Sequence, residues 1–269
     1  MEQNNCYLEE EKLFRLMLKF SIPCVLSMLV GALYNIIDQI FIGNSSIGTI
    51  GITATSVVFP MITIAMAFGL MLGDGATAYL SLCMGKRESD KIGKAIGSAI
   101  TIAAGIGVIF WIAGYSALDR ILNFLGAKTA ESMATSHEYA FWILLGLPFT
   151  ILGTSLTPIV RADGAPKVAM ASGLSGCLLN IVLDWLFIFP MHMDVAGAAI
   201  ATTIGNIVSF LIVFQYLFHT KSFQLKASDF VPDLPVIGQI GKLGLCRLPP
   251  SPNEDHGKNG GITMKLPCA

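Results

Sequence analysis

Residues 21–44 read SIPCVLSMLVGALYNIIDQIFIGN, an apolar run that contains a single charged side chain, Asp38. Counted from Lys19, 18 uncharged residues precede Asp38, and the apolar pattern continues to Ile42. A helix needs about 20 predominantly apolar residues to cross a bilayer. This stretch therefore predicts a membrane-spanning helix near residues 20–42.

Five further apolar segments follow, separated by charged or turn-forming residues. They predict spans near 48–73, with a continuation toward 84 left open, and near 95–118, 139–160, 168–190 and 195–218. We expect an all-α polytopic membrane protein with six transmembrane helices.

The domain organisation follows from these spans. Residues 1–19 form an N-terminal cytoplasmic segment, and residues 20–220 form one six-helix lobe. Residues 221–269 hold 6 of the 12 prolines and no apolar run long enough to cross a bilayer. From residue 246 onward, the Pro, Gly and polar content predicts disorder.

The composition excludes several classes of protein. The 269 residues are 54% hydrophobic and 13% charged, with a mean hydropathy of +0.67. An ordinary soluble domain is about 25% charged, so a soluble protein is not expected. A formal net charge of −1 gives no electrostatic basis for a nucleic-acid partner. Cys, His and carboxylates are too scattered for a zinc site, and we expect no cofactor.

Basic residues are distributed unevenly between the two sides of the predicted bundle. Eleven Lys and Arg residues fall on the side of both termini, and only Arg120 and Lys128 fall on the other. Because cytoplasmic loops carry an excess of basic residues, both termini are expected in the cytoplasm. We expect a multi-pass protein of the plasma membrane, the inner membrane in a bacterium, with the lipid bilayer as its surroundings.

Polar residues inside the spans are candidates for function. A carboxylate at mid-bilayer costs about 2.5–3.5 kcal/mol on insertion scales, so it usually faces a cavity or a partner. Asp38 lies in the first span and Asp184 in the fifth, with Asn180 one turn earlier on the same helix face. Asn35 shares a face with Asp38, and Thr202 offers a hydroxyl group in the sixth span.

Their predicted depths are compatible with one pocket. At 1.5 Å per residue, Asp38 lies ~7 Å, Asp184 ~9 Å, Asn180 ~15 Å and Thr202 ~11 Å from the outer ends of their helices. The alternative is that both carboxylates lie at the headgroup boundary, where charge is tolerated. Asp74 is expected at the cytoplasmic interface as a solvated acid near the end of its helix.

Pro23 has two interpretations. If the first helix begins near residue 20, Pro23 is a first-turn proline with no structural consequence. If the helix begins near Leu13, Pro23 is interior and predicts a kink, which would give the helix a hinge.

Several motifs in order resemble one transporter family. Tyr34-Asn35-x-x-Asp38 followed by Ile42-Gly43 resembles the first helix of multidrug and toxic compound extrusion (MATE) transporters. The segments GDGATAYLSLCMGKRESDKIGKAIG (73–97), LLNIVLDWLFIF (178–189) and VAGAAIATTIG (195–205) are similar to later parts of the same family. The resemblance runs from about Lys12 to Phe218 and is strongest to the prokaryotic DNA-damage-inducible F-like branch.

The resemblance implies an architecture and an activity. Family members have twelve helices in two lobes of six, and this chain would be the N-terminal lobe. The activity implied is antiport, coupled to H⁺ or Na⁺, that exports organic, often cationic, compounds. The residues that match the family's ion-coupling pocket are Asp38, Asn180, Asp184 and Thr202, supported by Tyr34 and Asn35, with Pro23 matching a helix hinge.

The chain departs from the family pattern after its sixth span. Residues 232–245 look like the interlobe linker and the start of a seventh helix, and the likeness stops at Cys246. The expectation is a truncated half that is inactive in transport, or that works as a homodimer or with a missing second lobe.

Two carboxylates in one poorly hydrated pocket suit a coupling ion. Both cannot easily ionise, so at least one pKa is expected to rise toward physiological pH and bind a proton. Alternatively, a Na⁺ ion would neutralise both, with Asn180 and Thr202 adding oxygen ligands.

An intramembrane protease with Asp38 and Asp74 as its pair is the enzymatic alternative, but ~29 Å would separate them along the bilayer normal, so no enzyme is expected. A lipid-linked oligosaccharide flippase would favour basic residues inside the spans, which are missing.

Overall fold

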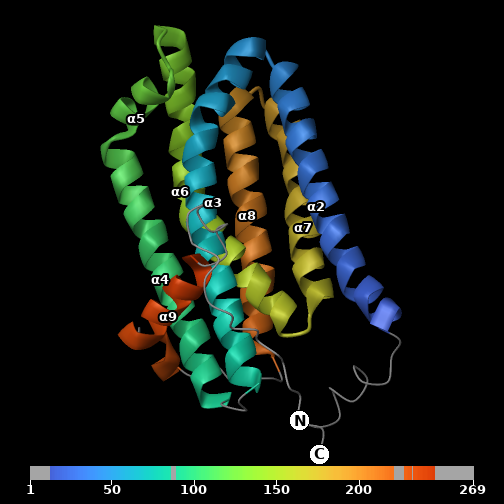
Figure 1. Ribbon diagram of the computed structural model, residues 1–269. Coiled ribbons are helices and arrows are strands. Elements are labelled where there is room, and N and C mark those ends of the chain that lie inside the picture. The colour runs from blue at the N-terminus through green and yellow to red at the C-terminus, as the bar shows by residue number, and fades with distance from the viewer. Residues whose placement is uncertain (1–12, 86–88, 221–226, 232, 246–269) are drawn as a thin grey trace, which may run out of the picture.

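The computed structural model describes residues 13–85, 89–220, 227–231 and 233–245. Six of its helices are long and apolar enough to cross a membrane. They are α2 (Leu13–Gly43), α3 (Gly48–Gly85), α4 (Ser89–Ser116), α6 (Ala130–Ala162), α7 (Pro166–Ile188) and α8 (Asp194–Phe218) (Figure 1). The prediction of an all-α bundle with six spans is confirmed.

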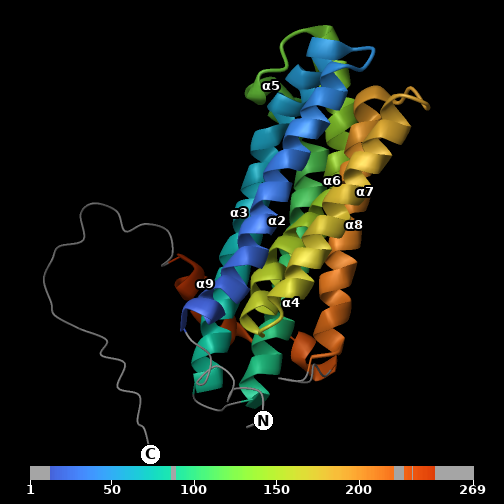
Figure 2. The ribbon, with the colours of Figure 1, turned by 90° about the vertical axis from the view of Figure 1, so that its right-hand side faces the viewer.

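The helices run roughly alongside one another, as both views show (Figure 2). The turns between α2 and α3 and between α7 and α8 meet at one end of the bundle, which we call the distal end. The other end, where α2 begins, is the proximal end.

Several helices are longer than predicted. α6 begins at Ala130, nine residues before the predicted start, because the charged residues of its first turns lie on an exposed helical face. Thr129 caps this helix by accepting a hydrogen bond from the Ser132 backbone at 3.2 Å. α3 continues to Gly85, in line with the continuation toward 84 that was left open. Asp74 was predicted near the end of this helix, but it lies inside it.

A short helix at the distal end was not predicted. α5 (Leu118–Leu125) buries Leu118 and Leu122 and leaves Phe124 exposed. Gly126, with φ +113°, ends it in a backbone conformation that favours glycine. Eight residues between two spans are too few for the length criterion that identified the long helices.

The bundle is held by close helix contacts. α3 packs along α6, and α8 packs against both α6 and α7. A Cβ atom on Gly73 would lie 2.5 Å from the Ser155 carbonyl oxygen, so only glycine allows this approach of α3 to α6. Small residues at such contacts are typical of membrane helices.

α2 lies at the edge of the bundle. It contacts α7 along its length and touches α3 and α8 less. Most apolar side chains of its described part are exposed, which suits a lipid-facing helix. Because α2 begins at Leu13, Pro23 is interior, as the second of the two interpretations required.

Two short helices follow the last span, inside the range predicted to be linker and tail. The 3₁₀ helix η2 (Ala227–Phe230) docks on α4, where the Thr101 hydroxyl donates to the Phe230 carbonyl at 2.7 Å. α9 (Leu234–Leu245) packs against α3, where a Cβ on Gly75 would meet the Ile240 carbonyl oxygen at 2.2 Å. The predicted disordered tail, 246–269, lies outside the described residues.

Candidate functional site

Two buried carboxyl groups meet between α2 and α7. Asp38 is 7% exposed and Asp184 is fully buried, and their side chains lie within hydrogen-bonding reach of each other. The Oδ1 atom of each is buried and has no hydrogen-bond donor among the described residues. Since a buried polar atom is normally satisfied, each of these Oδ1 atoms is an acceptor open to a proton or a small cation.

Asn180 connects Asp184 to α8. It lies one turn before Asp184 and is 2% exposed. The amide satisfies its surroundings when its nitrogen faces Asp184: the nitrogen then donates to Asp184 Oδ2 at 3.2 Å. In this orientation the amide oxygen accepts from Thr202, from the backbone N–H at 3.1 Å and from the hydroxyl at 3.2 Å.

A similar chain of contacts lies on the Asp38 side. The Gln39 Nε2 atom donates to Asp38 Oδ2 at 3.4 Å. The Thr55 hydroxyl, from α3, lies 3.2 Å from Gln39 Oε1 and donates to it. On both sides, therefore, a threonine hydroxyl faces an amide oxygen and the amide nitrogen faces a carboxyl Oδ2.

Two tyrosines complete the surroundings of the pair. Tyr34 from α2 and Tyr139 from α6 both lie close enough to Asp38 and Asp184 to interact with them electrostatically. Tyr139 is buried in the main apolar core. Tyr34 was among the residues expected to support the pocket, whereas Tyr139, Gln39 and Thr55 were not.

The structure brings four predicted residues together and places others elsewhere. Asp38, Asn180, Asp184 and Thr202 form one connected group, although an ion-binding role for them stays a prediction. Asn35 is exposed, and its amide donates to the Gly31 carbonyl of its own helix at 2.7 Å.

Pro23 lies outside that group, on the proximal side of α2. The Ser27 hydroxyl donates to its carbonyl at 2.8 Å, a bond of the kind that bends helices. Asp38 has Asp184 as its carboxyl neighbour, and not Asp74 as the protease alternative required.

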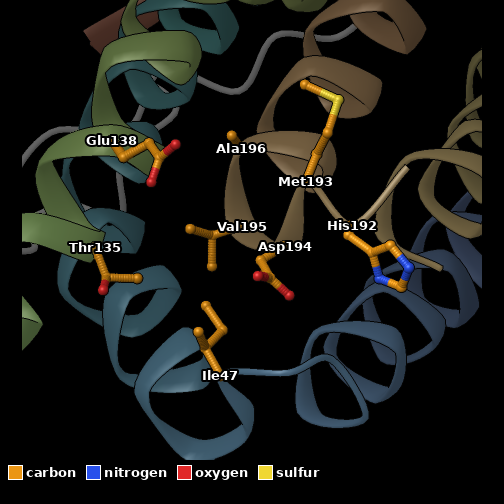
Figure 3. Close-up of a pocket in the computed structure, with 8 residues that line it drawn as sticks. All are labelled: Ile47, Thr135, Glu138, His192, Met193, Asp194, Val195 and Ala196. Atoms are coloured by element: carbon orange, nitrogen blue, oxygen red, sulfur yellow. The ribbon is translucent and has the colours of Figure 1, made fainter. Parts of the chain in front are cut away.

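A separate pocket opens at the distal end. It has a volume of about 250 Å³ and lies between the α2–α3 turn, α6 and the start of α8 (Figure 3). Beside it, Asp194 accepts hydrogen bonds from the Ser46 hydroxyl at 2.8 and 2.7 Å and from the Ser46 backbone N–H at 3.2 Å. Asp194 and His192 both have positive φ, 44° and 52°. The contact ties the two distal turns together.

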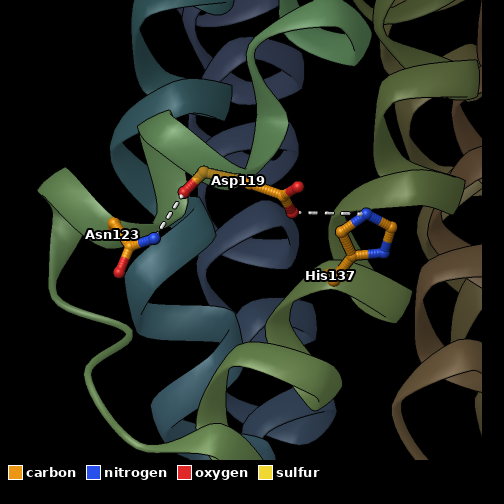
Figure 4. A network of polar contacts seen from close by, with 3 residues as sticks. All are labelled: Asp119, Asn123 and His137. Atoms are coloured by element: carbon orange, nitrogen blue, oxygen red, sulfur yellow. Dashed lines mark hydrogen bonds and ion pairs between the residues drawn. The ribbon is translucent and has the colours of Figure 1, made fainter.

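Two other polar features also lie away from the carboxyl pair. His137 on α6 approaches Asp119 on α5 at 3.7 Å, and Asn123 donates to the Asp119 carbonyl at 3.0 Å (Figure 4). The side chains of His137 and Asp119 are both largely exposed, so their contact adds little stability. A pocket of about 270 Å³ lies along the last turns of α8, beside Tyr216 and His219.

The chemistry open to the carboxyl pair is binding of a small cation. Among the described residues, no group of three or more His, Cys, Asp and Glu could hold a metal ion. Two carboxylates with a threonine hydroxyl nearby offer hard oxygen ligands of the kind that bind Na⁺, and carboxylate oxygens also accept protons.

Comparison with known proteins agrees with the fold. A family model described as MatE matches residues 23–186. The Multidrug export protein MepA of Staphylococcus haemolyticus (strain JCSC1435) is 32% identical over 245 residues, which cover 89% of this chain and 53% of that protein. The chain spans about half the length of the curated relatives it matches.

Solved structures show the same arrangement. A crystal structure of MATE in the bent conformation matches with a TM-score of 0.75 and 29% identity, covering 85% of this chain and 51% of that one. A crystal structure of MATE in the straight conformation matches with a TM-score of 0.76 and 28% identity, with the same coverage.

Proposed function

This chain belongs to the MATE family of transporters, and from that premise we propose that it serves a cation-coupled antiporter that exports organic, often cationic, compounds. Its ion-coupling pocket consists of Asp38, Asn180, Asp184 and Thr202, supported by Tyr34. The name of the curated relative, a multidrug export protein, supports the direction of transport.

One observation carries the proposal: the two neighbouring carboxyl groups whose Oδ1 atoms are buried and have no donor in the part of the chain that the structure describes. An apolar bundle gains nothing from two adjacent acids, because each loses its hydration and the two repel when both are charged. Their presence is explained if the protein exchanges a cation at this point. One proton shared between the Oδ1 atoms, or one Na⁺ ion, removes the repulsion.

Binding of the ion changes the charge between α2 and α7, and the hinge at Pro23 converts this change into movement of α2. Ion binding shifts the equilibrium between two conformations of α2 only to the extent that the ion binds one of them more tightly than the other. The bent and straight conformations named for the two solved structures support a conformational change in this fold.

The setting of the protein is proposed from its charge distribution and motifs. Eleven basic residues on the side of the termini favour cytoplasmic termini in a bacterial inner membrane. The motifs of the first, fifth and sixth spans favour the DNA-damage-inducible F-like branch of the family.

Transport needs a substrate path beside the ion pocket. We propose that small organic compounds cross between this lobe and a second lobe, which a second copy of this lobe is one way to supply. Two parallel copies have the same charge bias across the membrane, so the positive-inside rule allows them.

Ethidium efflux in everted membrane vesicles tests the proposal. The vesicles carry this chain or its Asp38→Asn/Asp184→Asn variant at equal abundance, and a pH or Na⁺ gradient is imposed. Efflux that depends on the gradient and is lost in the variant supports the antiport. Efflux from neither preparation shows that the chain alone is inactive in transport, and efflux equal in both removes the carboxyl pair from the mechanism.

A further inference from the structure

Gln39 is a neighbour of Asp38 whose amide orientation is determined by α3. Its Nε2 atom lies 3.4 Å from Asp38 Oδ2, and its Oε1 atom lies 3.2 Å from the Thr55 hydroxyl. An amide has donors on one side and an acceptor on the other. If Thr55 supplies a hydrogen to Oε1, the NH₂ group must therefore face the carboxyl group.

The hydroxyl hydrogen of Thr55 has two acceptors within reach. Besides Gln39 Oε1, the Ile52 carbonyl oxygen lies 2.9 Å away. That carbonyl already accepts from the Ser56 hydroxyl at 2.8 Å. Gln39 Oε1 has Thr55 as its hydrogen-bond donor, and Thr55 is 5% exposed, so little water competes for it. A hydrogen bond from the Thr55 hydroxyl to Gln39 Oε1 is therefore favoured over one to the Ile52 carbonyl oxygen.

The contacts of Gln39 and Thr55 match those on the other side of the pair. There, Thr202 faces the Asn180 oxygen and Asn180 donates to Asp184 Oδ2. In both carboxyl groups, the oxygen that faces an amide is Oδ2, and the oxygen without a donor is Oδ1.

We propose that Gln39 and Thr55 are positioning residues for Asp38, which hold the Oδ2 atom of its carboxylate and so direct the coupling ion to the Oδ1 atom. The inference rests on the proposed function, because it deepens the account of the same pocket. It also connects α3, through Thr55, to an ion-binding event between α2 and α7.

The expected consequence is a change in how readily Asp38 takes up a proton. A donor on the ionised form favours that form, so removing it favours the protonated form. The other titratable groups that face Asp38 are Asp184 from α7, Tyr139 from α6 and Tyr34 from α2. Replacing Asp184 by Asn isolates Asp38 from the strongest of these neighbours.

The test measures labelling of the full chain in membranes by dicyclohexylcarbodiimide, which reacts with protonated carboxyl groups in apolar surroundings. The fraction of labelled Asp38 peptide is determined by mass spectrometry across a pH series in the Asp184→Asn background. Gln39→Leu is expected to raise the pH of half-maximal labelling by about one unit, as loss of a hydrogen bond to a charged group implies. Thr55→Val is expected to raise it by about half a unit, because Gln39 remains but loses its orientation.

Three controls make the result specific. Thr55→Ser keeps the hydroxyl and is expected to restore the parent midpoint. Thr53→Val, on the exposed face of α3 where the hydroxyl bonds only within its own helix, is expected to leave the midpoint unchanged. In an Asp38→Asn background, Thr55→Val is expected to leave the labelling of Asp184 unchanged.

The outcomes separate this inference from the proposed function. Equal midpoints for Thr55→Val, Gln39→Leu and the parent overturn the inference, even if labelling is pH-dependent and the efflux variants behave as expected. A shift in Thr53→Val equal to that in Thr55→Val also overturns it, because the effect would then be general to α3. If neither Asp38 nor Asp184 is labelled at any pH in the unmodified chain, the proton-coupled form of the proposed function fails first.

Discussion

The carboxyl groups of Asp38 on α2 and Asp184 on α7 lie within hydrogen-bonding reach of each other, and each has a buried Oδ1 atom that no described residue supplies with a hydrogen. Their Oδ2 atoms, by contrast, face the amides of Gln39 and Asn180. In each carboxyl group, therefore, one oxygen is held by an amide and the other is left as a buried acceptor.

Neutralising either carboxyl group is expected to abolish ion-dependent efflux while the chain still folds. Asp38→Asn and Asp184→Asn each remove the charge that a coupling ion would balance, and the amide fits the space of the carboxyl group. Loss of efflux by a factor of ten or more, on the order of 1.4 kcal/mol, is the expected result in vesicles. Asp119→Asn is the matched control, since Asp119 is 78% exposed at the distal end. Unimpaired efflux in both pocket variants would exclude the pair as the coupling site.

Thr202→Val is expected to weaken Na⁺ binding if Na⁺ is the coupling ion. The change removes the hydroxyl 3.2 Å from the Asn180 amide and one oxygen near the pair. A bound ion stabilises the folded state by RT ln(1 + [Na⁺]/Kd). In detergent, the Na⁺-dependent rise in unfolding temperature should therefore shrink, corresponding to about tenfold weaker affinity. A Na⁺ response equal to that of the parent would show that Thr202 is not a ligand.

Pro23→Ala is expected to stabilise α2 and impair transport. An interior proline removes one backbone hydrogen bond and clashes with the preceding turn, at a cost of about 3 kcal/mol. The variant should unfold at a higher temperature and show slower efflux, with carbodiimide labelling of Asp38 unchanged. Faster or equal efflux would argue that the bend has no role in the transport cycle.

Gly75→Ala is expected to loosen α9. The new methyl group would lie 2.2 Å from the Ile240 carbonyl oxygen, so α9 must move away from α3, at a cost of about 1–3 kcal/mol. Trypsin cleavage after Lys242, on the exposed side of α9, should become faster. Gly31→Ala, where nothing lies within 4 Å of the added atom, is the control and should leave cleavage unchanged. Equal cleavage of all three chains would mean that this contact does not hold α9.

The sequence was enough to predict the number of spans and the members of the group around Asp184. Asp38, Asn180, Asp184 and Thr202 are polar residues at similar depth in apolar helices, and depth follows from counting residues along a helix. Their resemblance to a family pattern pointed to the same four. Counting along an axis does not, however, say which face of a helix meets which neighbour.

The residues that sequence reasoning missed can be identified only when the rotation of each helix about its own axis is known. Tyr139 stood at the predicted start of a helix, but α6 begins nine residues earlier and carries it into the core. Thr55 is one of many hydroxyl residues in α3, and only its approach to Gln39 distinguishes it from exposed Thr53. α5 was missed because it is too short for a membrane span, whereas α9 lies where the resemblance implied the start of a seventh helix.

The Ser46–Asp194 contact holds α2 at its distal end, because it fixes the α2–α3 turn to the start of α8. Asp38 lies near this fixed end, only five residues before the helix ends at Gly43. A bend of about 20° at Pro23 would move Leu13, ~15 Å farther along the axis, by about 5 Å. The displacement of α2 therefore grows toward its proximal end and is smallest near the carboxyl pair.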